Sequence, residues 1–179
     1  RALQTSGELL AGTFAGGVEQ KVERGTITQV ELTPPMSEAW TVPFLGGHTG
    51  FNWELGLNKD LPISLKIESG AGEAALDLSE LQVREFRIDT GASSSDITLP
   101  ARAGTTRAAI HAGAASVKVR VPQGVAASIH MDTGLTGCKV DTVRFPNLGG
   151  QNYRSTDYDN AANRVEIHVE AGVGSIEIL

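Results

Sequence analysis

Five glycines, here called the anchor glycines, divide the chain from about residue 65 onward into segments that resemble one another. They are Gly70, Gly91, Gly113, Gly134 and Gly172. The first three intervals between them are 21, 22 and 21 residues, and the last is 38, so about 17 residues are inserted there. A recurrence of this length is typical of chains built from stacked structural units.

Apolar residues alternate with polar ones on both sides of each glycine. Three residues before the glycines stand Ile67, Ile88, Ile110, Met131 and Val169, and six residues after them stand Leu76, Ile97, Val119, Val140 and Ile178. A period of two is typical of a strand that buries one face. We therefore expect each copy to be two short strands hinged at its glycine, which tolerates positive φ and leaves room for a neighbouring copy.

A single copy cannot bury its own apolar face. Copies stacked with their strands about 4.8 Å apart would build one continuous core. The sequence therefore predicts an all-β fold, in which residues 61–179 form a β-solenoid of the single-stranded β-helix type with repeats of about 21 residues and an inserted loop at about 142–164. An ordinary antiparallel sandwich is the alternative.

Residues 1–60 differ from the repeats, because they carry both tryptophans and three of the five phenylalanines. Alternation over residues 18–33 predicts a hairpin that turns near Arg24 and Gly25. Further bulk lies at Trp40, Val42 and Phe44, before a glycine-rich loop at residues 46–50. An open solenoid end would present unpaired strand edges. We therefore predict that residues 1–60 are a β-rich cap or a small sheet that closes the N-terminal end of the repeats.

Composition limits the classes of partner. The net charge is −6 and no long basic run is present, which argues against nucleic acid or an anionic membrane surface as the main partner. No stretch approaches the roughly 18 apolar residues of a membrane span. The single cysteine, Cys138, excludes an internal disulfide, and we expect it to be a small buried apolar residue.

The sequence holds no recognisable catalytic set. Ser93–Ser95 lacks the Gly-x-Ser-x-Gly elbow of a nucleophile, and the glycines are not followed by the Gly-Lys-Ser/Thr of a phosphate loop. Asp77 and Glu80 form a carboxylate pair on a predicted turn without a companion pocket. We therefore predict no enzymatic activity, no catalytic residue and no cofactor.

The outward faces of the stacked copies carry two rows of charge. Two residues before the glycines stand Glu68, Asp89, His111, Asp132 and Glu170, and four before them stand Lys66, Arg87, Ala109, His130 and His168. Ion pairs between neighbouring copies are the simplest explanation. In sequential stacking, His111 would lie between Asp89 and Asp132. Imidazole and carboxylate groups also bind zinc, so His111, His130, His168, Asp132 and Glu170 are weak metal-ligand candidates.

Three stretches of the sequence resemble the toast-rack domain family. They are LKIESGAGEAALDL at residues 65–78, IDTGASSSDITLP at 88–100 and VEAGVGSIEI at 169–178. The family includes adhesin-like domains and the C-terminal domains of LiaF-like cell-envelope stress proteins of bacteria. The resemblance implies a β-solenoid-like fold, usually joined to an N-terminal membrane segment that this chain lacks, and it implies no established catalytic activity.

Together these features predict a non-enzymatic binding, sensing or scaffolding domain of the bacterial cell envelope, the soluble part of a membrane-anchored protein. Its partner would be a protein or an envelope polymer, and an oligomer is compatible with the sequence. Two alternatives remain open. One is a self-assembling, bactofilin-like structural solenoid, and the other is a β-helix enzyme that acts on polysaccharides.

Overall fold

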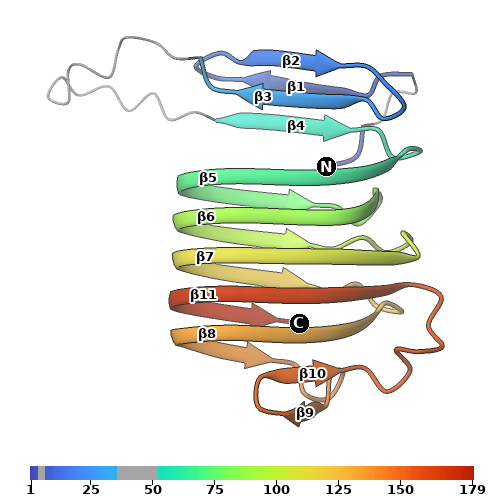
Figure 1. The fold of residues 1–179 in the computed structure, drawn as a ribbon, viewed down its shortest axis with the longest axis vertical. Coiled ribbons are helices and arrows are strands. Elements are labelled where there is room, and N and C mark those ends of the chain that lie inside the picture. Colours follow the sequence, from blue (N-terminus) through green and yellow to red (C-terminus); the bar gives the residue numbers. More distant parts are fainter. Residues whose placement is uncertain (4–6, 36–51) are drawn as a thin grey trace, which may run out of the picture. The chain divides into compact units, whose positions relative to one another are not determined.

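A computed structural model describes residues 1–3, 7–35 and 52–179 (Figure 1). These residues form strands, turns and loops, and no helix among them is long and apolar enough to cross a membrane. The chain divides into two compact units. One is Glu8–Gly56, and the other combines Arg1–Gly7 with Leu57–Leu179. The predicted bulk at Trp40, Val42 and Phe44 and the loop at 46–50 lie outside the described residues.

The smaller unit is built from short strands. These are β1 (Leu10–Phe14), β2 (Glu19–Glu23), β3 (Gln29–Thr33) and β4 (Trp53–Leu57). β2 pairs antiparallel with β3 and places Val22 opposite Val30, which confirms the hairpin. β1 pairs with β4, and the rings of Phe14 and Trp53 meet edge to face at 5.2 Å. The closing role of residues 1–60 stays a prediction.

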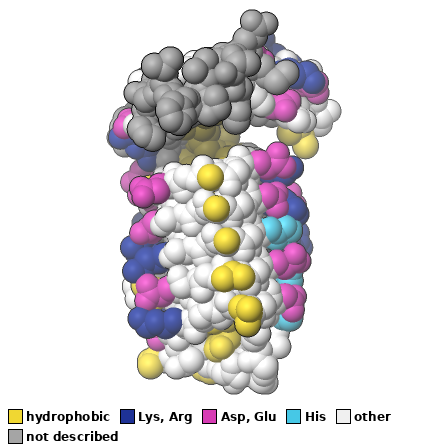
Figure 2. All heavy atoms as spheres, turned by 90° about the vertical axis from the view of Figure 1, so that its left-hand side faces the viewer, with side chains coloured by type: hydrophobic (Ala, Val, Ile, Leu, Met, Phe, Trp, Pro, Cys, Tyr) yellow, Lys and Arg dark blue, Asp and Glu magenta, His cyan; other side chains and the backbone are white. Residues whose placement is uncertain are grey.

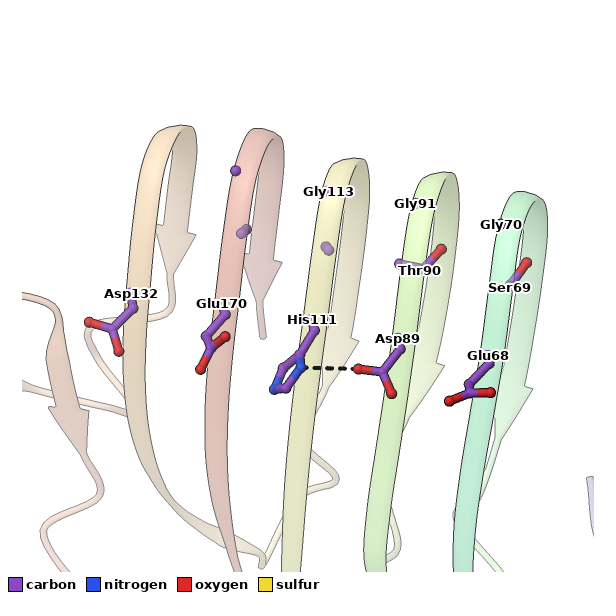
Figure 3. A pocket seen from close by; sticks show the side chains of 13 residues that line it. Glu68, Ser69, Gly70, Asp89, Thr90, Gly91, His111, Gly113, Asp132 and Glu170 are labelled. Carbon is purple, nitrogen blue, oxygen red and sulfur yellow. Dashed lines mark ion pairs between the residues drawn. The ribbon is translucent and has the colours of Figure 1, made fainter.

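Five long strands dominate the larger unit. They are β5 (Pro62–Asp77), β6 (Gln82–Thr98), β7 (Thr105–Arg120), β8 (Ala126–Val140) and β11 (Arg164–Ile178). Each is one continuous strand that bends back on itself, as Figure 1 shows, and not two separate strands as we expected. The anchor glycines Gly70, Gly91 and Gly113 lie at this bend (Figure 3). The backbone therefore keeps its extended conformation through the glycine and changes direction there.

The long strands pair in parallel at positions that share the same distance from a glycine. Ile67 is opposite Ile88, Ile88 is opposite Ile110, and Val169 pairs with both Ile110 and Met131. Parallel pairing excludes the antiparallel sandwich, because that fold has no such neighbours. The register also places chemically similar side chains beside one another along the sheet.

The order of the strands departs from their order in the sequence. The seven-stranded sheet runs β5-β6-β7-β11-β8-β10-β9, so β11 lies between β7 and β8 and pairs with both. The segment that connects β8 to β11 contains the predicted insertion. It carries β9 (Asn147–Gly149) and β10 (Asn152–Arg154), and β10 pairs antiparallel with β8. This arrangement places the insertion beside the first half of β8.

The core lies between the two arms of the bent strands. Before the bend Ile88, Ile110 and Val169 are at most 1% exposed, and after it Ile97, Val119 and Ile178 are fully buried. Burying each such side chain contributes roughly 1.5–3 kcal/mol. Cys138 is exposed, so its predicted burial is wrong. It lies in the second half of β8, and β10 pairs with β8 only at residues 128–130.

The bend carries a column of apolar residues next to the glycines. Ala71, Ala92 and Ala114 occupy it on β5, β6 and β7, and Val173 and Leu135 continue it on β11 and β8. Figure 2 shows such a column between two charged flanks. Val173 is 54% and Leu135 85% exposed. The bend is thus an apolar ridge with a charged surface on each side.

Candidate functional site

A row of acidic side chains and one histidine follows one flank of the bend. It consists of Glu68, Asp89, His111, Glu170 and Asp132, from β5, β6, β7, β11 and β8 in that order. We call it the acidic row. Figure 3 shows its five side chains projecting to the same side of adjacent strands. With Gly70, Gly91, Gly113 and Gly172 they line a shallow surface groove.

The acids on β5 and β6 are paired mainly within their own strands. Lys66 contacts Glu68, and the Arg87 guanidinium donates to both oxygens of Asp89, at 2.7 and 2.8 Å. Residues two apart on a strand share a face, so a long basic side chain can reach the acid. The hydrogen bonds from Arg87 lower the pKa of Asp89. This end of the acidic row is therefore largely charge-balanced.

His111 lies in the middle of the acidic row, and its neighbours differ from those we predicted. They are Asp89 and Glu170, not Asp89 and Asp132, because β11 separates β7 from β8. His111 Nδ1 is 3.0 Å from both Arg87 Nη2 and Asp89 Oδ1. This nitrogen accepts from Arg87 when unprotonated and donates to Asp89 when protonated.

The structure brings His130 and His168 together on β8 and β11. Their rings stack with centroids 5.2 Å apart and planes inclined by 15°. The Nε2 atoms of His130 and His168 lie 3.2 and 3.9 Å from the same oxygen, Asp132 Oδ2. His168 Nε2 is also 3.1 Å from Glu170 Oε1. Four of the five predicted metal-ligand candidates therefore meet at this point.

Asn152 is a site residue that the sequence reasoning missed. β10 places it opposite His130, where its Oδ1 lies 2.6 Å from His130 Nδ1. This hydrogen bond is the main cause of the raised pKa of His130, and the nearby Asp132 carboxylate adds to it. The insertion carries no repeat that could be aligned with the other copies, so nothing in its sequence predicts that Asn152–Arg154 joins β8.

The opposite flank of the bend carries ion pairs between strands. Glu177 on β11 lies between Lys118 on β7 and Lys139 on β8, at 2.9 and 2.7 Å. Arg120 on β7 contacts Asp96 on β6. The hydrogen bonds from Lys139 and Lys118 lower the pKa of Glu177 from 4.5 to about 2. These pairs link β11 to the strands on both of its sides.

Replacing Glu177 with glutamine should remove part of the acid sensitivity of the fold. A carboxyl whose pKa is lower in the folded chain stabilises it above its unfolded pKa, and this contribution is lost as the pH falls from about 4.5 toward 2. Urea unfolding should therefore show a modest deficit for the variant at pH 7 that narrows toward pH 2. Glu73→Gln, on β5, is the control. An equal deficit at pH 7 and pH 2 would contradict this assignment.

The fold and the rows of charged side chains on both flanks of the bend define the class of protein. It is an all-β domain with a large mixed sheet, and its long parallel strands carry rows of similar side chains. Residues 7–120 match the family described as the N-terminal domain of toast_rack, DUF2154. Since the match spans more than half of the chain, the chain belongs to the toast-rack family, as its sequence predicted.

Two further comparisons bear on the fold. The crystal structure of a putative cell adhesion protein from Clostridium sporogenes is similar to the chain, with a TM-score of 0.82 and 22% sequence identity. The similarity covers 97% of this chain and 84% of that one. At this identity the likeness establishes the fold alone. A comparison with curated proteins finds no match.

Proposed function

We propose that this chain is a non-enzymatic binding domain of the bacterial cell envelope, built as a β-solenoid-type stack that presents the acidic row to an extended, positively charged polypeptide segment of a partner protein. Membership of the toast-rack family supports the envelope setting. The name of the structural neighbour, a putative cell adhesion protein, points the same way. Attachment to a membrane and the self-assembling alternative stay predictions.

The observation that carries this proposal is the shared register of the long strands. It repeats one side-chain position at every strand, about 4.8 Å apart, and so produces a straight acidic row beside glycines that add no side chains. A flat groove of this kind suits an extended chain that contacts each strand in turn.

Charge complementarity favours a cationic ligand. Four of the five residues in the acidic row are carboxylates, but only Glu68 and Asp89 contact a lysine or an arginine of their own strand. Glu170 and Asp132 are paired with histidines instead. The β11 and β8 end of the row is therefore negative whenever these imidazoles are neutral, and lysine or arginine side chains would gain from binding there.

Binding of a fluorescent eight-residue peptide of alternating lysine and glycine, followed by anisotropy at pH 8 with EDTA present, tests this proposal. Replacing Asp132 with asparagine and Glu170 with glutamine should weaken binding by about 2- to 30-fold, because each exposed ion pair contributes roughly 0.2–1 kcal/mol. The matched control is Glu73→Gln with Glu80→Gln, which removes the same charge from exposed positions outside the acidic row.

The control pair should leave the affinity nearly unchanged. Binding should also weaken with salt, since it depends on charge. Equal weakening by both pairs of substitutions would mean that only the net charge of the chain matters. That result, or a peptide that does not bind to the unsubstituted chain, would overturn the proposed role of the acidic row.

A further inference from the structure

His130, Asp132 and His168 form a compact group of potential metal ligands. Among residues 1–3, 7–35 and 52–179 they are the group of three in which one ligand atom from each residue lies within 4.8 Å of the others. Two strands supply them, since β8 carries His130 and Asp132 and β11 carries His168. The parallel register holds His130 directly opposite His168. Their closeness therefore results from strand pairing and not from a mobile loop.

The distances within the group suit a tetrahedral ion. Zinc binds imidazole nitrogen and carboxylate oxygen at about 2.0–2.2 Å, which in a tetrahedron places neighbouring ligand atoms about 3.3–3.6 Å apart. The two Nε2 atoms lie 3.2 and 3.9 Å from Asp132 Oδ2. All three ligand atoms lie within 4.8 Å of one another, so a bound ion would have to draw them closer together. Both imidazoles lie near Asp132 Oδ2, and His168 also has Glu170 within 3.1 Å, so two imidazoles and two carboxylates surround one point.

Asn152 sets the ring of His130 in the orientation that a metal requires. The amide nitrogen of Asn152 donates to the Gly149 carbonyl at 3.1 Å, so its oxygen is the atom that faces His130 Nδ1. An oxygen there accepts a hydrogen bond from Nδ1–H, so the neutral ring carries its lone pair on Nε2, the nitrogen that faces Asp132. Hydrogen bonds of this kind hold most metal-binding histidines in proteins.

We propose that His130 Nε2, His168 Nε2 and Asp132 bind a divalent transition-metal ion of the zinc class, with Glu170 as a fourth ligand and Asn152 as a positioning residue. Glu170 pairs with Asp132 across the two strands and already contacts His168. Imidazole together with carboxylate favours zinc, nickel or copper, while calcium and magnesium prefer sites made entirely of oxygen. The ion would join β8 to β11. It would share Asp132 and Glu170 with the acidic row and so compete with a cationic peptide there, but this inference does not rest on the proposed peptide ligand.

Imidazole NMR at pH 8 with increasing zinc chloride tests the site directly, because metal ligands must be deprotonated. An untagged chain with His48→Asn and Cys138→Ser removes an imidazole and a thiol that are not members of the group. The ring signals of His130 and His168 should shift together and saturate at one zinc per chain, while His111 should respond weakly. Calorimetry should give the same stoichiometry, and magnesium chloride should cause neither effect.

Substitutions separate a built site from adventitious binding. His168→Asn and Asp132→Asn should each abolish the one-to-one binding, and Asn152→Ala should weaken it by about 10- to 100-fold, as loss of such a supporting hydrogen bond does. His111→Asn is the matched control, since it removes an imidazole from the neighbouring strand and should leave zinc affinity unchanged. Melting curves without metal should confirm that each variant folds.

The proposal fails if zinc does not shift the NMR ring signals of His130 and His168. It also fails if His111→Asn weakens zinc binding as strongly as His168→Asn, because the chain would then bind zinc through scattered surface imidazoles. If the Asn152→Ala variant binds zinc with full affinity, Asn152 is not a positioning residue. The assignment of the three ligands would then remain.

Discussion

Replacing Ile88 with aspartate should unfold the larger unit. The side chain of Ile88 is 1% exposed and packs between Ile67 and Ile110 on the neighbouring strands. These two neighbours are apolar and provide no cation for a carboxylate at this position. The free energy of unfolding of most domains is only about 5–15 kcal/mol, and burying an unpaired charge costs more than this. Circular dichroism should show no cooperative melting transition for this variant.

The same strand provides controls for this prediction. Ser94→Asp adds the same charge at an exposed position of β6 and should melt close to the unsubstituted chain. Ile88→Val removes one buried methylene and should cost about 0.5–1.5 kcal/mol. A soluble Ile88→Asp variant with a cooperative transition would show that the inward face of β6 is wrongly assigned.

The second large effect is expected at the anchor glycines, where neighbouring backbones approach one another. A Cβ atom at Gly91 would overlap the carbonyl oxygen of Gly70 on β5. β6 is hydrogen-bonded to a strand on each side and cannot move away without breaking these bonds. Gly91→Ala should therefore destabilise the fold by roughly 1–3 kcal/mol, as overpacking of a core does. The midpoint of urea unfolding measures the loss.

Gly70 is a matched control for Gly91, because it holds the same anchor position on β5. A Cβ there meets no atom within 4 Å, so Gly70→Ala should leave stability unchanged or raise it slightly. Gly174→Ala should be worse than Gly91→Ala, since it adds a positive φ of 137° to an overlap with the Ala115 carbonyl. Equal losses at Gly70 and Gly91 would show that the glycines are needed for their flexibility and not for close packing.

The alternating pattern predicts much of the fold because it is local information. It identifies which side of each long strand faces inward, as the burial of Ile88, Ile110 and Val169 confirms. The order of neighbours is a different matter. All five copies present nearly the same inward face, so any two of them are compatible, and the pattern cannot favour β8 over β11 as the partner of β7. Sequential stacking was therefore a reasonable prediction and a wrong one.

The candidate site, like the fold, is only partly predictable from the sequence. Residues two apart on a strand share a face, so the acidic row and the neighbourhood of His130 and His168 follow from the sequence once the copies are aligned. Asn152 does not follow, because it lies in the insertion, which repeats nothing. The exposure of Cys138 was not predicted for a related reason. Alignment of the copies assigns the same surroundings to each of them, whereas the second half of β8 has fewer neighbours than β6, β7 and β11.

The position of β11 has a consequence for how the chain reaches its final structure. Of the five long strands β11 leaves the ribosome last, yet it is hydrogen-bonded along both edges. Until it is available, β7 and β8 each keep an open edge during synthesis, and this raises the hazard of aggregation. The matching strand of a second copy would fit the same gap equally well. Exchange of β11 between copies is therefore a built-in route to an intertwined dimer, because each stack would be complete without any new interface.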